Sequence, residues 1–327
     1  MARLVVGAAC SHALALMEPD TWDRFRAWNR EHYARRYGAL PPENPHVEQE
    51  SDEDIARRYE AVRAGLDALR ERLRAADLDA LIIIGDDQDE NFTEENLPQL
   101  AVYLGEDFHC VDRSSGEPVP RVYRCQPDLA WHLYEHSVNS GFDLAACKRF
   151  PDGQLKAHAV GPVLARLVPD ARVPVVPIFV EAIHHPAVSP ARCHQFGQTL
   201  RTAVELWTGG ERVGVCASGG LSHFTAGYPY KALEGRHGFA HGSISEDFDR
   251  QALSWMANGE AEKLSGLSSR DLLEHGAVEL RSWITLLGMV GGARAERLAY
   301  EPLYRGLMGM GVASWSLEAP VAASAGR

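Results

Sequence analysis

The chain has 327 residues, 45% of them hydrophobic and 24% charged, which is enough to bury the core of one large α/β domain. Its net charge is −12, from 45 acidic and 33 basic residues, so nucleic acid is not an expected partner. No run approaches the roughly 20 apolar residues of a membrane span, and no signal-peptide pattern follows Met1. The six cysteines form no close CxxC pair, so disulfides and a zinc finger are not expected. We therefore expect a cytoplasmic protein without a membrane partner.

The first part of the chain predicts a strand, an excursion and a long helix. An apolar run over residues 4–9 predicts a buried strand that ends at Ser11 and His12. Residues 37–54 are rich in Pro, Glu and Asn and predict an irregular excursion. Residues 55–76 then carry valine and leucine at helical spacing between arginine and glutamate, which is typical of a surface helix packed on a sheet.

The middle of the chain predicts two further strands. An apolar run over residues 80–84 stops at the polar segment 85–91. Residues 104–124 form a second polar excursion, expected to be a lid or a hairpin, and residues 127–139 read as a helix. Another apolar run, over residues 173–180, stops at Glu181 and the histidine pair that follows it.

The most distinctive segment follows the apolar run Val215-Cys216-Ala217. Gly219 and Gly220 end this run, and Ser222 and His223 come next, so a strand end delivers a histidine that is a candidate acid or base. In open α/β sheets, ligands bind outside the carboxyl ends of the strands. We therefore predict an α/β fold in which residues 1–327 form a single large domain, with a central mixed or mostly parallel sheet flanked by helices.

These motifs together resemble the class III extradiol ring-cleavage dioxygenases, the family of the protocatechuate 4,5-dioxygenase β subunit and of bacterial dihydroxyphenylpropionate dioxygenases. The resemblance extends over nearly the whole chain. It is carried by Ser11-His12, by Gly219-Gly220-Leu221-Ser222-His223, and by the His-Pro-x-x-Ser-Pro-Ala-Arg-Cys pattern that begins at His185. Residues 268–283, with Gly276, Glu279 and Trp283, resemble the late helix of the family.

The resemblance implies a non-haem Fe(II) enzyme that opens a catechol-type ring with O₂ and forms a homodimer. Its substrate would be a gallate or protocatechuate derivative such as 3-O-methylgallate. By the family's pattern, His12 is the first iron ligand, a histidine after the second strand is the second, and a carboxylate beyond the Gly-Gly-x-Ser-His element is the third. Such a facial triad leaves coordination positions for the substrate and O₂.

The sequence departs from this pattern at the second ligand, where Gln88 follows Asp87 and the family usually has Asp-His. A glutamine carbonyl is a neutral donor like imidazole, but it is harder and weaker and lacks the second ring nitrogen that orients a histidine. Three outcomes are open: Gln88 binds the metal, the role passes to Asp87 or Glu90, or the site has lost its metal. The Gly-Asp-Asp-Gln segment resembles one in some relatives near the 3-O-methylgallate dioxygenases.

Two adjacent acids compete for the third ligand position. Glu246 and Asp247 lie in a segment that resembles the family's Asn-x-Glu-aromatic-Asp, and either could serve. The alternative is structural, because Ser243 or Ser245 can cap a helix that begins here, and acids in its first turn are favoured by the helix dipole.

The resemblance assigns the proton chemistry to His158 and His223. His223 would take a catechol proton, and His158 would stabilise or protonate the oxygen intermediate. We expect the substrate to contact Ser222, Arg192 and one of His184 and His185, because adjacent residues of an extended strand face opposite sides. An anionic substrate also needs basic groups nearby, and the further candidates are Lys148, Arg149 and Lys231.

Two other classes of function fit parts of the sequence. The fold could be retained as a binding protein that has lost its metal, an idea motivated by Gln88. It could also be a metal-dependent hydrolase, in which His12, Asp86, Asp87 and Glu246 hold a metal-bound water. The hydrolase accounts less well for the Gly-Gly-Leu-Ser-His and His-Pro patterns, and oxygen uptake with catechols distinguishes the dioxygenase from both.

Overall fold

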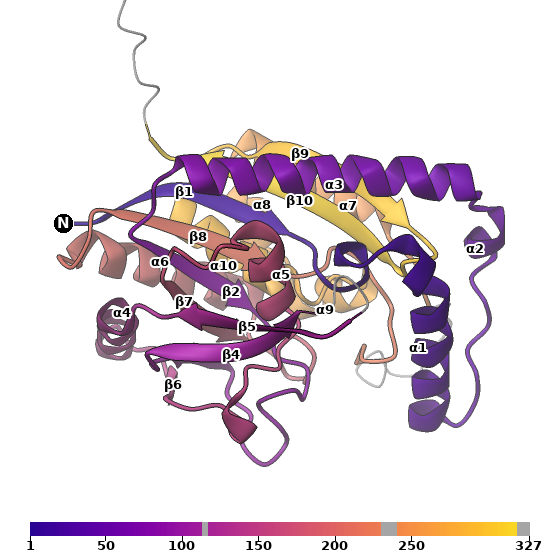
Figure 1. Cartoon of the computed structure of the whole chain (residues 1–327), viewed down its shortest axis with the longest axis horizontal. Coiled ribbons are helices and arrows are strands. Elements are labelled where there is room, and N and C mark those ends of the chain that lie inside the picture. The colour runs from indigo at the N-terminus through magenta and orange to yellow at the C-terminus, as the bar shows by residue number, and fades with distance from the viewer. Residues whose placement is uncertain (113–116, 230–240, 319–327) are drawn as a thin grey trace, which may run out of the picture.

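An eight-stranded sheet forms the centre of the computed structural model, which describes residues 1–112, 117–229 and 241–318 (Figure 1). In order across the sheet, the strands are β6 (Ala145–Cys147), β3 (Leu100–Tyr103), β7 (Val175–Val180), β2 (Ala80–Gly85), β8 (Arg212–Ser218), β1 (Arg3–Cys10), β10 (Met308–Ser316) and β9 (Glu296–Leu303).

The four central strands, β7, β2, β8 and β1, run parallel to one another. On one side β10 pairs antiparallel with β1, and on the other β3 pairs antiparallel with β7, so the sheet is mixed. The predicted α/β fold with a central mixed or mostly parallel sheet is confirmed. Because parallel strands end at the same edge, the segments that follow these four strands all begin on one side of the molecule.

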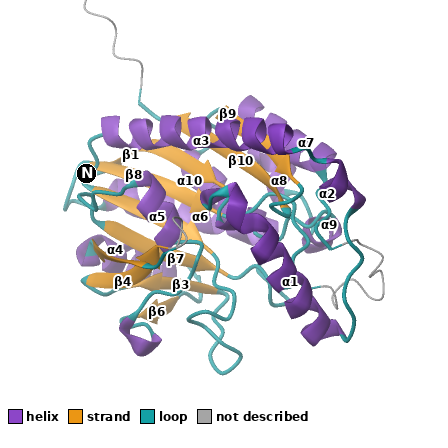
Figure 2. Ribbon diagram, turned by 45° about the vertical axis from the view of Figure 1, so that its right-hand side comes forward, coloured by secondary structure: helices purple, strands orange, loops and turns teal. Residues whose placement is uncertain are grey.

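Helices cover both faces of the sheet (Figure 2). One face carries α3 (Asp52–Ala75) and α5 (Gly161–Leu167). The opposite face carries α4 (Pro127–Asn139), α6 (Pro190–Leu206), α7 (Glu246–Asn258), α8 (Ala261–Ser265) and α10 (Leu280–Val290). The central strands are therefore apolar on both sides: Ile82 and Ile84 pack on the α6 and α10 face, whereas Leu81 and Ile83 pack on the α3 face.

Two of the helices begin at caps that the sequence supplies. The Ser51 side chain accepts a hydrogen bond from the Asp54 backbone N–H at the start of α3, and Ser189 does the same for Arg192 at the start of α6. Helix α6 packs closely against α10, because Gly197 and Gly288 leave no side chain between the two backbones.

Both predicted excursions contain regular structure. Residues 37–54 include α2 (Pro45–Gln49) and follow α1 (Trp22–Tyr37), while residues 104–124 contain the hairpin of β4 (Asp107–Asp112) and β5 (Val119–Arg124). Single 3₁₀ turns lie at Ala13–Leu16, Pro19–Thr21 and Pro151–Gly153.

The late helix expected over residues 268–283 is interrupted, which corrects the prediction. Helix α9 (Ser269–Glu274) ends before Gly276, whose φ of +69° is left-handed, and α10 begins only at Leu280. The chain therefore turns between the two helices, and Glu279 lies at the amino end of the second one.

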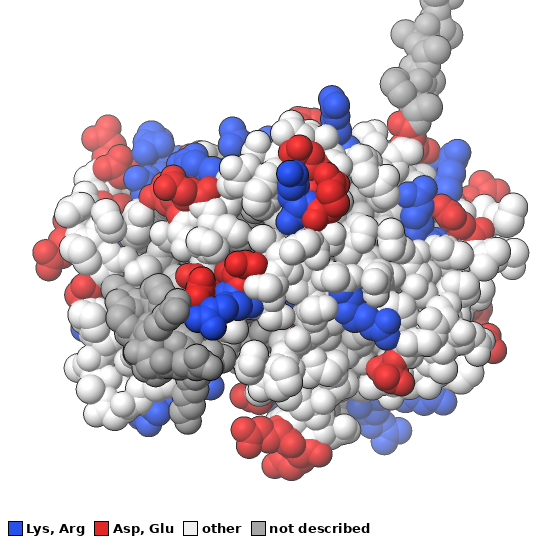
Figure 3. Space-filling view, turned by 180° about the vertical axis from the view of Figure 1, so that it is seen from behind, with Lys and Arg blue, Asp and Glu red and all other residues white. Residues whose placement is uncertain are grey.

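The surface carries charges of both signs. On the face shown in Figure 3, basic and acidic side chains lie next to one another in small groups separated by uncharged surface. No helix among the described residues is long and apolar enough to cross a membrane. All six cysteines are free.

Candidate functional site

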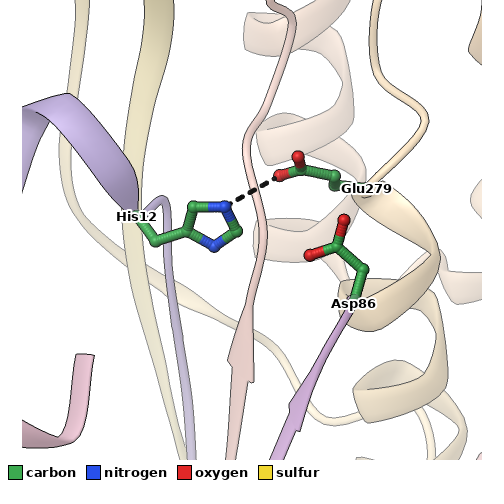
Figure 4. Close-up of side chains that lie close together, drawn as sticks. All are labelled: His12, Asp86 and Glu279. Carbon is green, nitrogen blue, oxygen red and sulfur yellow. Dashed lines mark ion pairs between the residues drawn. The ribbon is translucent and has the colours of Figure 1, made fainter. Parts of the chain in front are cut away.

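Three buried side chains from distant parts of the chain meet at the carboxyl edge of the sheet (Figure 4). His12 follows β1, Asp86 follows β2, and Glu279 precedes α10. One ligand atom from each lies within 4.8 Å of the other two. We call these three residues the cluster.

His12 is held in place through its Nδ1 atom, which lies 2.9 Å from the Ser218 Oγ at the end of β8. In the tautomer that donates from Nδ1, Nε2 directs its lone pair toward Glu279, whose Oε2 is 3.4 Å away. Burial lowers the pKa of His12 to about 3, with the charge of Glu279 opposing this shift, so the ring is neutral at pH 7. A neutral imidazole is the form that binds a metal ion.

Glu279 accepts more hydrogen bonds than the other two members of the cluster make. Its Oε1 accepts hydrogen bonds from Gln88 Nε2 at 2.7 Å and from His223 Nε2 at 3.1 Å, while its Oε2 accepts the Gly220 backbone N–H. A side chain at Gly220 would overlap the His223 ring, so glycine is required for this close approach. Burial acts to raise the pKa of Glu279, but His223 and His12 outweigh it and hold the pKa below its usual range.

Asp86 differs because one of its oxygens has no partner. The side chain is fully buried; Oδ2 accepts a hydrogen bond from Gln88 Nε2 at 3.0 Å, whereas Oδ1 has no hydrogen-bond partner. Burial, and then the nearby charge of Glu279, raise the pKa of Asp86 well above its usual range. The protein alone therefore leaves this carboxylate poorly compensated.

Gln88 bridges the two carboxylates of the cluster through its amide nitrogen. Its amide oxygen lies on the side of Gly227. The opposite amide orientation would set the oxygen against two carboxylate oxygens, so the hydrogen-bond pattern fixes the orientation.

The other two acids of this loop have structural partners. Asp87 accepts the backbone N–H groups of Glu90, Asn91 and Phe92, which closes the loop after β2. Glu90 accepts both the His158 backbone N–H at 3.0 Å and its Nδ1 at 2.9 Å. Neither Asp87 nor Glu90 belongs to the cluster.

The structure brings His158 and His223 to the same place. The His158 ring lies edge-on to His12, with ring centroids 4.6 Å apart. Burial lowers the pKa of His158, but the charge and hydrogen bond of Glu90 outweigh it and raise the pKa to about 10. Burial likewise lowers the pKa of His223, while Glu279 and the Leu221 carbonyl raise it to about 9. Both rings therefore hold a proton at pH 7.

A cavity of about 620 Å³ opens onto these groups. It is lined by His12, Gln88, Glu90, His158, His223 and Glu279. Residues of α1, among them Phe25, Trp28 and Arg36, line it too, as do Cys110 and Val111 of the hairpin. A volume of this size is typical of a small-molecule site.

Glu246 and Asp247 are not brought to the cluster, where Glu279 is found instead. Glu246 lies in the first turn of α7, where it accepts a hydrogen bond from the Tyr304 hydroxyl at 2.6 Å and pairs with Arg250. Asp247 is exposed. The helix-start alternative describes both acids, because acids in a first turn are favoured by the helix dipole.

None of the four candidates for substrate contact, Ser222, His184, His185 and Arg192, lines the cavity. Ser222 is buried and donates to Asp249 at 2.7 Å, which holds the loop after β8 against α7. His184 lies between Glu181 and Asp89, and His185 is exposed. Arg192, which is on α6, lies over the Phe142 ring and donates a hydrogen bond to the Gly141 carbonyl.

The basic residues suggested for an anionic substrate also lie elsewhere. Lys148 lies over the Trp131 ring, and Arg149 does not line the cavity. Lys231 falls outside the described residues. Arg36 of α1 and Lys156 also line the cavity, although neither was among these candidates. Lys156 pairs with Asp152, whereas Arg36 lies over the Tyr37 ring and donates hydrogen bonds of 3.4 and 3.3 Å to the Ala226 and Gly227 carbonyls.

The donor set of the cluster suits a divalent cation. A neutral imidazole nitrogen and two carboxylates converge, and one buried carboxylate oxygen lacks a partner. Carboxylate and imidazole donors are those that divalent iron and manganese accept. A cation here would also separate the His12 lone pair from the facing Glu279 oxygen.

Comparison with known proteins places the chain in a family. The model of the catalytic LigB subunit of aromatic ring-opening dioxygenase matches residues 41–313. The chain is 23% identical over 293 residues to the 2,3-dihydroxyphenylpropionate/2,3-dihydroxicinnamic acid 1,2-dioxygenase of Cupriavidus necator, covering 78% of this chain and 88% of the relative. It is 28% identical over 173 residues to the gallate dioxygenase of Pseudomonas putida, covering 52% of this chain and 46% of that protein.

A solved structure of an uncharacterized protein from Escherichia coli K12 covers 95% of this chain, with a TM-score of 0.47 and 14% identity. The family match spans most of the chain and confirms the resemblance predicted from the strand-end motifs. The chain therefore belongs to the LigB family and is an extradiol-type aromatic ring-opening dioxygenase.

Proposed function

We propose that the protein is an Fe(II)-dependent dioxygenase that opens a catechol-type ring next to its diol. The observation that carries this proposal is that His12 and Glu279 of the cluster line one cavity together with His158 and His223. His12 and Glu279 would hold the iron, together with a third donor from the loop after β2. Bound Fe(II) would supply a Lewis acid for the diol oxygens and a redox-active ion through which electrons pass from the catechol to O₂.

The two histidines beside the cluster would handle protons. A catechol must lose protons to bind a metal well, and His223 is placed to accept one once the Glu279 charge that raises its pKa is shared with a cation. His158 faces the cavity from the side of His12 and is held protonated by Glu90, so it would donate a proton or a hydrogen bond to oxygen. The two rings would thus serve as base and acid.

The remaining wall of the cavity favours an aromatic acid as substrate. Phe25 and Trp28 offer aromatic surface, and Arg36 has no carboxylate partner among the described residues. A carboxylate on the ring would pair with this guanidinium. A gallate or protocatechuate derivative such as 3-O-methylgallate has this chemistry, and the gallate and dihydroxyphenylpropionate enzymes among the relatives support the proposal.

Anaerobic loading with Fe(II), followed by O₂ consumption and product absorbance, tests the proposal. The panel would include 3-O-methylgallate, gallate, protocatechuate and a simple alkyl catechol. Oxygen uptake equal to substrate consumed, with a yellow ring-opened product, is the expected result. Iron that does not bind, or that binds without uptake on any diol, would contradict the proposal, and anaerobic turnover would point to hydrolysis.

Three variants separate the roles of the histidines. His12→Ala should lose iron, because it removes a ligand. His223→Ala should retain most of its iron and lose most of its turnover. His109→Ala is the control, since His109 is exposed and does not line the cavity. Normal iron occupancy in His12→Ala, or full activity in His223→Ala, would remove that residue from its role.

A further inference from the structure

We infer that Asp86, rather than Gln88, supplies the third donor of the metal site. Gln88 is a supporting residue whose amide group hydrogen-bonds to both Asp86 and Glu279 and holds them side by side. The inference rests on the proposed function only in that the cluster binds a divalent cation. It differs from the expectations drawn from the sequence, in which Gln88, Asp87 or Glu90 holds the metal or the metal is lost, and in which Asp86 is a ligand only in the hydrolase alternative.

The first argument is the unmatched hydrogen-bonding capacity of Asp86. The side chain is 0% exposed, and its Oδ1 is the one carboxylate oxygen of the cluster without a partner. Buried polar atoms are normally satisfied, and a buried carboxylate without a partner is costly. The carboxylate points toward the space between His12 and Glu279, so a cation bound there would give Oδ1 a partner (Figure 4).

The second argument is that Gln88 is already engaged. Its amide nitrogen donates to Asp86 at 3.0 Å and to Glu279 at 2.7 Å. To present its oxygen to a metal, the amide would have to turn over, and both carboxylates would lose this donor. Asp86 would then have neither oxygen satisfied while remaining buried. With its amide nitrogen bonded to both carboxylates, Gln88 instead orients them, as residues around metal ligands commonly do.

The third argument is charge. The two carboxylates and one imidazole of the cluster would balance the charge of a divalent cation bound by all three. A cation held by His12, Gln88 and Glu279 would leave Asp86 as an additional buried charge beside the site. One imidazole and two carboxylates are a harder ligand set than the two histidines and one carboxylate of the family's pattern. Such a set suits Mn²⁺ as well as Fe²⁺.

Metal binding and thermal stability, measured without substrate or oxygen, test this assignment. The wild type, Asp86→Asn and Gln88→Ala are titrated anaerobically with Fe(II) and separately with Mn(II). Asp89→Asn is the matched control, because it removes the same charge from the same loop outside the cluster. Metal-free melting shows that each variant is folded.

We expect the metal-free Asp86→Asn variant to be at least as stable as the wild type, because an unpaired buried carboxylate has been removed. It should lose Mn(II) affinity by more than about 100-fold, the upper range for losing a group that only supports a ligand. Mn(II) should therefore raise the melting temperature of the wild type, Gln88→Ala and Asp89→Asn, but not of Asp86→Asn. A structure of the Mn(II)-loaded wild type should place an Asp86 oxygen on the metal.

The opposite pattern would overturn the inference: stabilisation by Mn(II) in Asp86→Asn together with its loss in Gln88→Ala. A wild type that binds no Mn(II) or Fe(II) would overturn it as well. A wild type that binds metal through Asp86 but consumes no O₂ with any diol would refute the proposed function and support the ligand assignment.

Discussion

Replacement of Glu90 by Gln tests whether this acid sets the protonation of His158. The Glu90 carboxylate accepts the His158 Nδ1 at 2.9 Å and its backbone N–H at 3.0 Å. A hydrogen bond to a charged group contributes about 1.5–3 kcal/mol, and about 1.4 kcal/mol corresponds to one pKa unit. The His158 and Glu90 side chains are 31% and 25% exposed, so solvent screening favours the lower end of that range. We expect the pKa of His158 to fall from about 10 by at least about one unit in Glu90→Gln.

The same pair makes stability depend on pH. Because the folded-state pKa of His158 is raised above 6.5, its contribution is fully present below pH 6.5 and is lost as pH rises toward 10. The free energy of unfolding of Glu90→Gln should therefore fall below that of the wild type by about 1–2 kcal/mol at pH 6, and by less at pH 9.5.

Histidine carbon resonances of the metal-free protein, followed against pH, measure the pKa directly, and urea unfolding at the two pH values measures the stability. In the loaded enzyme, the basic limb of kcat/KM should move to lower pH. Glu94→Gln, an exposed change in the same loop, is the control. An unchanged His158 titration in Glu90→Gln, or a loss of stability that is the same at both pH values, would refute the reasoning.

Three further predictions concern the cavity and the frame around it. Gly197→Ala should separate α6 from α10, because a Cβ there would overlap the Thr285 carbonyl. The free energy of unfolding should fall by about 1–3 kcal/mol, and an unchanged melting temperature would contradict the close packing. Asp249→Ala leaves the Ser222 N–H and hydroxyl without their acceptor. The free energy of unfolding measured in urea should fall by about 2–4 kcal/mol, and a fall of less than about 1 kcal/mol would show that Ser222 finds another partner. Trp28→Ala should raise KM for aromatic acids with little change in stability, since the ring lines the cavity and is 50% exposed; an unchanged KM would exclude α1 from substrate binding.

The sequence predicted the four central strands but not β3, β6, β9 and β10, because a strand buried on both faces is a continuous apolar run. β1, β2, β7 and β8 lie where these runs occur, and α4 covers the predicted residues 127–139. His12, Gln88, His158 and His223 could be placed near one another because each follows such an element or a recognisable motif. The parallel arrangement of the four central strands then brings their ends to one edge.

Glu279 could not be assigned in the same way, because nothing in a single sequence distinguishes a buried acid at a helix start from an exposed one. The run over 268–283 looked like one helix, whereas the turn at Gly276 ends α9 and lets Glu279 approach Gly220. The available signal was the acid inside an otherwise apolar segment before Trp283. Glu246 and Asp247 are candidates because their segment resembles the family's Asn-x-Glu-aromatic-Asp, but α7 directs them to Tyr304, Arg250 and solvent.

The sequence by itself determined the α/β architecture, the apolar strands and the histidines that end them, since these depend on local patterns of burial and on residue chemistry. Only the tertiary structure decided which carboxylates complete the cluster and which residues line the cavity. Asp86, Glu279 and Arg36 come from segments far apart in the chain. The burial of the two acids and the position of Arg36 at the cavity exist only once the sheet edge, α10 and α1 have come together.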